Sequence, residues 1–445
     1  MTTYWCERAW LPPGRVAEQV VVEVDGGRIR ALREQVPSTP PGAETLRGIV
    51  LPGLANAHSH AFHRALRGRT ASGRGDFWTW REQMYTVAER LDPERYRALA
   101  EAVYAEMALA GITCVGEFHY LHHGPDGTPY ADPNTMGLAL VDAARAVGLR
   151  IALLDTCYLA AGFDAPPQGV QVRFSDGDAE RWAQRVDALA AACAGADDVV
   201  VGAAVHSVRA VPAAQIPTVV AWAAARAAPL HVHLSEQRAE NTACLAAHGI
   251  SPTELLADAG ALGPRTTAVH ATHVGFDDVA LLAASRTGVC ACPTTERDLA
   301  DGIGPFAQLV DAGVALSLGS DSHAVVDLFE EARAVELDQR LASQQRGHFP
   351  AAALLDAVTR SGHAALGFPD AGRLEVGARA DLVAVRLDSV RTAGTPPAEG
   401  VVFAATAADV SDVVAGGRRL VADGAPVDGV PVGARLARAI AEVLS

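Results

Sequence analysis

The stretch Leu51-Pro-Gly-Leu-Ala-Asn-Ala-His-Ser-His60 places two histidines, one residue apart, directly after an apolar run. The run begins at Gly48 and is typical of a buried strand that is interrupted by the Pro-Gly pair. Residues i and i+2 of a strand share a face, so His58 and His60 can turn their imidazoles toward one Zn²⁺ at about 2.0 Å. Taken alone, the pair fits two polar loop histidines equally well, and the rest of the chain decides.

The composition is that of an enzyme-sized protein with a full apolar core. The 445 residues are 49% hydrophobic, enough for one large domain and a smaller one. The chain shows neither a signal-peptide pattern nor an apolar run of about 20 residues, so we expect a cytoplasmic protein without a membrane partner. Seven scattered cysteines include no Cys-x-x-Cys, and a net charge of −15 argues against nucleic acid as a partner.

The chain contains no lysine at all. This excludes Schiff-base chemistry, lysine-anchored pyridoxal phosphate and a P-loop lysine. It also excludes a carboxylated lysine that bridges two metal ions.

Apolar, strand-like runs alternate with longer Ala- and Leu-rich helical patterns through the middle of the chain, which is typical of repeated β-α units. Such units predict a (β/α)₈ barrel, in which the functional groups lie where strands end and loops begin. The eight predicted strands are 48–57, 113–119, 150–157, 199–206, 229–234, 267–272, 288–292 and 314–320.

Both ends of the chain carry alternating apolar and polar residues with glycine turns, a pattern that favours hairpins. We therefore expect residues 1–50 and 366–432 to pair into one small β-sandwich domain. The barrel would take residues 51–365, and residues 433–445 have the apolar spacing of a closing helix.

Polar groups follow four of the predicted barrel strands. His58 and His60 follow the first strand, and His233 and Glu236 follow the fifth. His270 ends the sixth strand, and a carboxylate, Asp321, follows the eighth. Any one of these could be a core or capping residue, but four strands presenting such groups at one rim predict a common site.

These residues resemble the metal sites of the amidohydrolase superfamily, and the β module built from both termini matches that superfamily too. The resemblance is closer to the N-formimidoyl-L-glutamate deiminases of bacterial histidine degradation, and it covers essentially the whole chain. The motifs that carry it are Asn56-Ala-His-Ser-His-Ala-Phe-His-Arg-Ala-Leu-Arg-Gly68, Phe77-Trp-Thr-Trp-Arg81, Cys292-Pro-Thr-Thr-Glu296 and Gly319-Ser-Asp-Ser-His323.

The resemblance implies hydrolytic deimination of N-formimidoyl-L-glutamate to N-formyl-L-glutamate and ammonia. Glu236 would carry a proton to the leaving nitrogen, while His270 and Asp321 orient the attacking water. With no lysine to bridge two ions, we expect one Zn²⁺ per chain, although the ligand set also suits Fe²⁺ or Mn²⁺. The predicted metal ligands are His58, His60, His233 and Asp321.

A substrate with two free carboxylates needs cationic, preferably bidentate, donors. Arg81 and Arg209 are the predicted donors, and the family pattern adds Tyr120 and His206. The family pattern has glutamine where this chain has His63, which leaves the preference for an imino group open. The tryptophans beside Arg81 are interpreted as core residues.

Three alternatives remain at this point. A deaminase of a nucleobase or another heterocycle would share the metal site but need flat apolar walls. An N-formyl amino-acid amidohydrolase would release formate, and a metal-free scaffold of the same fold would have lost its ligands. Since related enzymes are commonly dimers, we expect a homodimer with a small diacid as its ligand.

Overall fold

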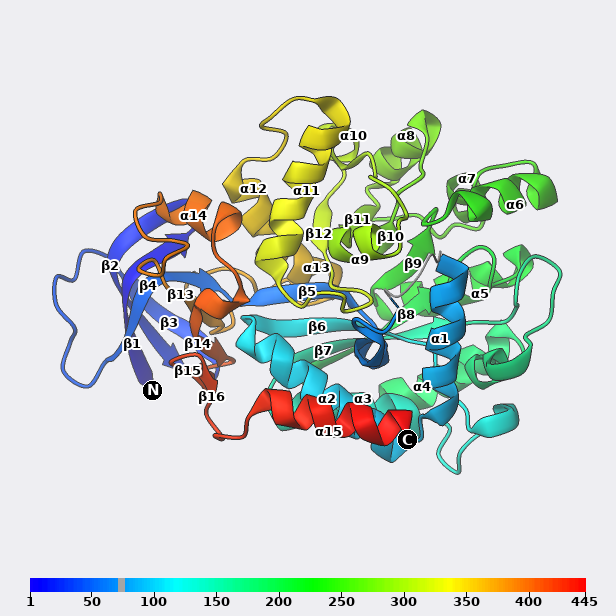
Figure 1. Cartoon of the computed structure of the whole chain (residues 1–445), viewed down its shortest axis with the longest axis horizontal. Coiled ribbons are helices and arrows are strands. Elements are labelled where there is room, and N and C mark those ends of the chain that lie inside the picture. The colour runs from blue at the N-terminus through cyan, green and yellow to red at the C-terminus, as the bar shows by residue number, and fades with distance from the viewer. Residues whose placement is uncertain (71–76) are drawn as a thin grey trace.

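The computed structural model describes residues 1–70 and 77–445, which form a parallel barrel and a second sheet (Figure 1). Neighbouring strands of the barrel pair in sequence order, and a bridge between Ser59 and Asp321 joins its first and last strands. The expected (β/α)₈ barrel is thus confirmed. Its strands are β5 (Leu54–Ser59), β6 (Ile112–His119), β7 (Arg150–Cys157), β8 (Val199–Val205), β9 (Leu230–Leu234), β10 (Thr266–His270), β11 (Gly288–Ala291) and β12 (Leu316–Leu318).

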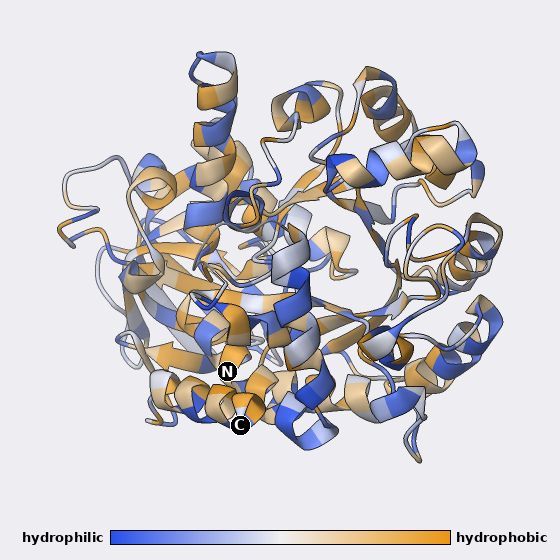
Figure 2. Cartoon of the chain, turned by 45° about the vertical axis from the view of Figure 1, so that its right-hand side comes forward, coloured by the Kyte–Doolittle hydropathy of each residue, from blue (hydrophilic) through white to orange (hydrophobic). Residues whose placement is uncertain are grey.

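The helices surround the barrel and bury one face each. In Figure 2 the central strands are mostly hydrophobic, whereas the surrounding helices mix hydrophobic and hydrophilic residues, as one-sided burial requires. Among the described residues, no helix is long and apolar enough to cross a membrane. The α-helices of this part are α1 (Phe77–Arg90), α2 (Pro93–Leu109), α3 (Thr135–Val147), α4 (Ala179–Ala192), α5 (Ile216–Arg226), α6 (Arg238–His248), α7 (Pro252–Asp258), α8 (Phe276–Ser285), α9 (Pro293–Asp298), α10 (Phe306–Asp311), α11 (Leu328–Ser343), α12 (Ala351–Asp356) and α13 (Gly362–Ala365).

Five short 3₁₀ helices and one π-helical turn, η5, complete the connections among the described residues. Two of them matter for the site, because η1 follows the His-x-His motif and η3 lies beside the pocket. The six are η1 (Ala61–Leu66), η2 (Pro125–Gly127), η3 (Gly169–Phe174), η4 (Ala213–Gln215), η5 (Ala357–Ser361) and η6 (Ala407–Asp409).

The first predicted strand, 48–57, is wrong as a single element. The structure divides it into β4 (Glu44–Pro52), which belongs to the second sheet, and the barrel strand β5. The chain changes sheets at Gly53, where a Cβ would lie 2.2 Å from Thr113 Oγ1 and 2.7 Å from Asp381 Cβ. Only glycine fits at this crossing, because any side chain would displace both neighbours.

The second sheet is built from both ends of the chain, as expected. Its eight strands follow the order β16-β15-β14-β13-β4-β1-β2-β3. The sheet curls on itself, since Ile29 N of β3 donates to Ala378 O, just before β13, at 2.9 Å. It encloses its own apolar core. The exact boundaries between the β-sandwich domain and the barrel domain stay a prediction. The remaining elements are β1 (Thr2–Leu11), β2 (Arg15–Asp25), β3 (Arg28–Arg33), β13 (Leu382–Val385), β14 (Val410–Ala415), β15 (Arg418–Ala422), β16 (Ala425–Pro426), α14 (Pro397–Phe403) and the closing helix α15 (Val432–Leu444), which packs on α2.

A buried ion pair ties the two sheets together. Arg150, the first residue of β7, donates to both carboxylate oxygens of Asp381, with Arg150 Nη1 3.0 Å from Asp381 Oδ1. Asp381 also accepts a hydrogen bond from Gly416 N at 2.8 Å, and both partners of the pair are almost fully buried. Burial opposes ionisation of Asp381, but Arg150 outweighs it and lowers the pKa of the carboxyl.

We expect Arg150→Met to lower the free energy of unfolding by about 3–5 kcal/mol, because it leaves the Asp381 carboxylate buried without its cation. Urea titration followed by circular dichroism measures the loss. The matched control is Arg145→Met, which breaks the half-exposed pair with Asp198 and should cost no more than about 1 kcal/mol. Equal losses in the two variants would contradict the structural role of the buried pair.

Candidate active site and metal centre

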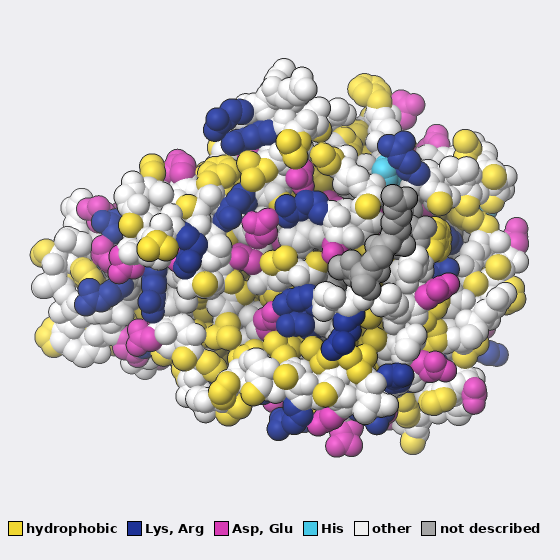
Figure 3. All heavy atoms as spheres, in the orientation of Figure 1, with side chains coloured by type: hydrophobic (Ala, Val, Ile, Leu, Met, Phe, Trp, Pro, Cys, Tyr) yellow, Lys and Arg dark blue, Asp and Glu magenta, His cyan; other side chains and the backbone are white. Residues whose placement is uncertain are grey.

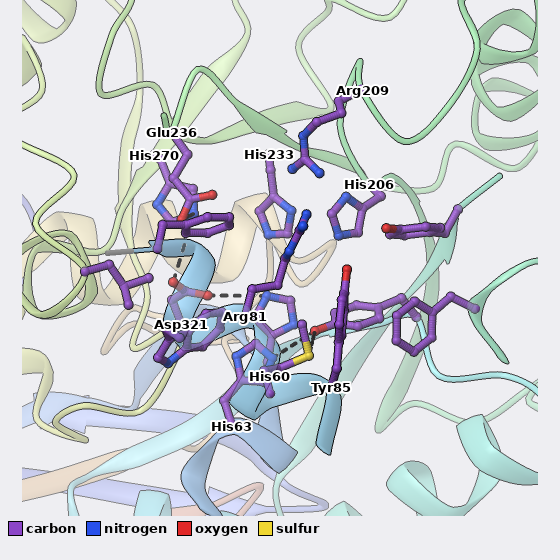
Figure 4. Close-up of a pocket in the computed structure, with 17 residues that line it drawn as sticks. His60, His63, Arg81, Tyr85, His206, Arg209, His233, Glu236, His270 and Asp321 are labelled. Carbon is purple, nitrogen blue, oxygen red and sulfur yellow. Dashed lines mark hydrogen bonds and ion pairs between the residues drawn. The ribbon is translucent and has the colours of Figure 1, made fainter. Parts of the chain in front are cut away.

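A pocket opens at the carboxyl ends of the barrel strands and holds about 560 Å³ of atom-free space, including the part open to solvent. Every residue predicted from the sequence as a site residue lines it, except His58, which is fully buried. Figure 4 shows the labelled side chains converging on this space from opposite walls. The predicted residues that line it are His60, His63, Arg81, Tyr120, His206, Arg209, His233, Glu236, His270 and Asp321.

The four predicted metal ligands meet at one point. Each offers a ligand atom, and these atoms all lie within 4.8 Å of one another. Asp321 Oδ1 lies 3.3 Å from both His58 Nε2 and His60 Nε2. His233 Nε2 lies 3.1 Å from His58 Nε2.

The protonation of this group fits a bound cation. His60 Nδ1 lies 2.9 Å from the Phe118 carbonyl oxygen, which can only accept, so Nδ1 carries the proton and Nε2 presents a lone pair. Burial lowers the pKa of His58 to about 3 and that of His60 to about 4, so both rings are neutral near pH 7. The lone pair on His60 Nε2 faces the Asp321 carboxylate at 3.3 Å and repels it, and a divalent cation between them removes that repulsion.

The backbone holds the ligands from the first and last strands against each other. Asp321 N donates to His58 O at 3.0 Å, and His60 N donates to Asp321 O at 3.2 Å. Gly319 makes this approach possible, because a Cβ there would lie 2.7 Å from the Cβ and the carbonyl oxygen of His58. Non-glycine residues at this rim also adopt positive φ, among them His270 (70°) and Asp321 (41°), and such strain clusters at functional sites.

A buried glutamate that sequence reasoning missed supports the His-x-His turn. Glu117 on β6 accepts hydrogen bonds from Ser59 Oγ at 2.8 Å and from Ala61 N at 2.7 Å. Ser59 Oγ also lies 2.9 Å from Nε2 of the buried His323. A glutamate inside an otherwise apolar strand was the available signal, but its partners become known only from the fold.

Glu236 and His270 lie side by side above the ligands. Glu236 Oε1 is 3.8 Å from His270 Nε2, which is 4.0 Å from Asp321 Oδ2. Burial raises the pKa of Glu236 to about 7, which suits a group that accepts and returns a proton. Burial works against the charged form of His270, but Glu236, Glu296 and Asp321 outweigh it and raise its pKa.

Two arginines line the same pocket. The Arg81 guanidinium lies over the Trp78 ring, 4.4 Å from its centroid, and Arg209 Nε is 3.7 Å from Glu240 Oε2. His63 Nε2 is 2.8 Å from the Tyr120 hydroxyl. The core interpretation holds for Trp80, which packs in the main apolar core and also lines the pocket, but it is wrong for Trp78, which is 39% exposed. Sequence reasoning also missed Phe77, Met84, Tyr85, Tyr158, Phe174 and Leu299 in the pocket wall.

A second group of potential ligands, His119, His122 and Asp155, lies away from the pocket. Both carboxylate oxygens of Asp155 already accept hydrogen bonds from Arg185, at 2.9 and 2.8 Å. The Arg185 guanidinium therefore already supplies the cation for Asp155. The group is a buried ion pair with two neutral histidines beside it.

Comparison with known proteins places this site in a family context. Residues 49–420 match the model described as Amidohydrolase family. The chain is 39% identical to formimidoylglutamate deiminase of Pseudomonas aeruginosa, with 95% of each chain covered. It is 31% identical to 8-oxoguanine deaminase of the same organism, over 93% of this chain and 92% of the other.

Two solved structures superpose closely on the fold. An amidohydrolase from Brucella melitensis shares 32% identity with a TM-score of 0.93 over the full length of both chains. An adenosine deaminase from Xanthomonas campestris, solved with bound zinc, shares 25% identity with a TM-score of 0.86, over 99% of this chain and 97% of the other.

We expect chelator-treated protein to take up one Zn²⁺ per chain, and His60→Ala to weaken that binding. The loss should exceed the about 10- to 100-fold that removal of a supporting hydrogen bond costs, because a ligand itself is removed. Competition titration with a chromogenic chelator measures the affinity. The control is His231→Ala, which removes another buried barrel histidine, one that contacts the Ala365 carbonyl. Undiminished zinc affinity in His60→Ala, or an equal loss in both variants, contradicts the assignment.

Proposed function

The chain belongs to the amidohydrolase family, and from that membership we propose that it hydrolyses N-formimidoyl-L-glutamate to N-formyl-L-glutamate and ammonia. One observation carries the substrate assignment. The same pocket holds a proton-carrying carboxyl, Glu236, beside the ligand cluster, and it is also lined by two arginines, Arg81 and Arg209. An amidine that bears two carboxylates needs both kinds of group. The reaction would belong to histidine degradation, as the resemblance implies.

We propose Zn²⁺ as the cofactor, at one ion per chain, since it supplies a Lewis acid and lowers the pKa of water to about 7. The three histidines and one aspartate suit this ion, and the Xanthomonas campestris structure was solved with zinc. Fe²⁺ and Mn²⁺ also accept such ligands.

The chain's own residues manage the protons. Glu236 accepts a proton from the water that adds to the C=NH carbon, and Asp321 and His270 hold that water in line. Glu236 then delivers this proton to the nitrogen, which becomes NH₂. The remaining proton of the water leaves the new hydroxyl with the help of Asp321 and His270 and reaches the same nitrogen, so the C–N bond breaks and ammonia leaves. The carbonyl of N-formyl-L-glutamate forms at the same carbon.

The arginines hold the substrate carboxylates with charge-assisted hydrogen bonds. His206, Tyr120 and His63 line the space between the arginines and the ligand cluster, where they orient the amidine. A heterocycle deaminase is the second candidate, because the 8-oxoguanine deaminase is similar along nearly the whole chain. The cytoplasmic location, the homodimer and the lack of nucleic-acid or membrane partners stay predictions.

We expect zinc-loaded protein to release ammonia from N-formimidoyl-L-glutamate but not from 8-oxoguanine or adenosine. Glu236→Gln should lower kcat by about 10²- to 10⁴-fold, because it removes the proton carrier but keeps the side chain's shape. A coupled ammonia assay measures both. The variant should still bind zinc at wild-type stoichiometry, which separates lost proton transfer from lost metal. No ammonia release from N-formimidoyl-L-glutamate, together with turnover of a heterocycle, would falsify the substrate assignment.

We expect kcat/KM to fall as the pH is lowered through an apparent pKa at or below about 7. Burial raises the pKa of Glu236 to about 7, and a cation beside it would lower that value. Below this pKa the carboxyl is protonated and cannot accept the proton from water, so activity is lost toward acid. A pH titration of kcat/KM tests this. The residual kcat/KM of Glu236→Gln should not show this fall toward acid. A wild-type profile without an acidic limb would exclude Glu236 as the base.

A further inference from the structure

Two tyrosine hydroxyls in the pocket wall have no part in the function proposed so far. Tyr85 lies on α1, and Tyr158 directly follows β7. Both contact one buried side chain, Gln171 on η3, which is 5% exposed. Gln171 Nε2 lies 2.9 Å from the Tyr85 hydroxyl oxygen and 2.8 Å from that of Tyr158.

The orientation of the Gln171 amide is fixed by the backbone. Gln168 N donates to Gln171 Oε1 at 3.0 Å, and a backbone N–H can only donate. The amide oxygen must therefore face Gln168, and the NH₂ group must face the tyrosines. Each tyrosine oxygen accepts one of the two amide protons, so each hydroxyl proton needs another acceptor.

At least one of these protons is left for a ligand. Tyr158 and Tyr85 lie within hydrogen-bonding reach of each other, so at most one proton can be used between them. Burial raises the pKa of the Tyr158 hydroxyl, although Arg209 and Arg81 oppose this effect. The hydroxyl thus stays protonated and remains a donor.

The space that these hydroxyls border is cationic. Figure 4 shows the Tyr85 hydroxyl pointing into the same space as the guanidinium groups of Arg81 and Arg209 and the ring of His206. Arg81 Nε is buried and has no hydrogen-bond partner among the described residues. The Tyr158 ring packs on His206, with 4.6 Å between the ring centroids. Hydroxyl donors beside two guanidinium groups match a carboxylate.

We propose that Tyr85 and Tyr158, oriented by Gln171, complete with Arg81 and Arg209 a carboxylate-binding site that makes the pocket selective for diacids. This inference rests on the proposed function and specifies its substrate class. A ligand without the carboxylate would leave buried donors without acceptors, and such a loss discriminates more strongly than a change in apolar contact. Gln171 acts as a positioning residue, since it touches the tyrosines and not the ligand.

Binding of product analogues tests the site without any turnover. Calorimetry on the zinc-loaded full chain would compare N-formyl-L-glutamate with two ligands that each lack one charge, N-formyl-L-glutamine and N-formyl-4-aminobutyrate. We expect the double variant Tyr85→Phe/Tyr158→Phe to bind the diacid about 10- to 100-fold more weakly. One monoacid lacks the carboxylate that the tyrosines bind, and its affinity should fall less than about threefold in the double variant.

A second variant tests the role of Gln171 and keeps both tyrosines. In Gln171→Glu the carboxylate can still accept from Gln168 N but now also accepts the tyrosine protons, so we expect diacid binding to weaken at least as much as in the double variant. Tyr130→Phe, outside the pocket, is the control and should bind like the wild type.

Diacid affinity within twofold of wild type in the double variant, or equal losses for all three ligands, would overturn the inference. So would a wild-type chain that does not bind the diacid. If the diacid binds through the tyrosines but N-formimidoyl-L-glutamate yields no ammonia, the proposed function fails and the carboxylate site stands.

Discussion

The backbone pairing of Ser59 with Asp321 is the constraint on which the site depends. It joins the first and last strands of the barrel, so closing the barrel brings two histidines of β5 and its following turn against the carboxylate that follows β12. Side chains of residues more than 250 positions apart in the sequence thus bring their potential ligand atoms together. Gly319 permits the contact, and Glu117 fixes the turn between the histidines from the neighbouring strand.

Burial then sets the chemistry of each group according to its neighbours. The same loss of water keeps His58 and His60 neutral, which suits metal ligation, and makes the Glu236 carboxyl easier to protonate, which suits proton transfer. Asp321 is the exception. Burial alone would raise its pKa, but contact with His58, His270 and His60 lowers it. One low-dielectric pocket therefore produces ligands, an anion and a proton carrier.

The sequence contained enough to predict the barrel and the rim residues, because β-α alternation sets the architecture and the architecture sends strand ends to one edge. It showed an interruption at Pro52 and Gly53 but not a passage between sheets there, since a local pattern does not tell which sheet each half of the run joins. Glu117 and Gln171 were beyond reach for another reason. Glu117 stands out as a charged residue in an apolar strand, but its role, like that of Gln171, depends on hydrogen bonds to side chains distant in the sequence, which only the fold reveals. Tyr85 lies within the Trp-rich motif, but only the fold turns its hydroxyl toward Tyr158.

The distribution of charge explains how an acidic protein can hold a diacid. The chain carries a net charge of −15, and arginine and acidic side chains are interspersed on the face shown in Figure 3. Inside the pocket, Glu236 and Asp321 lie with the ligand cluster, Arg81 and Arg209 line the same space, and neutral hydroxyls supply further donors without added charge. In the function proposed here, the substrate has the complementary pattern, with a basic amidine at one end and carboxylates at the other. Only one orientation pairs every charge, and that orientation puts the amidine carbon beside Glu236. A flat neutral heterocycle would offer the two guanidinium groups no carboxylate to bind, so the charges that orient a diacid disfavour the heterocycle.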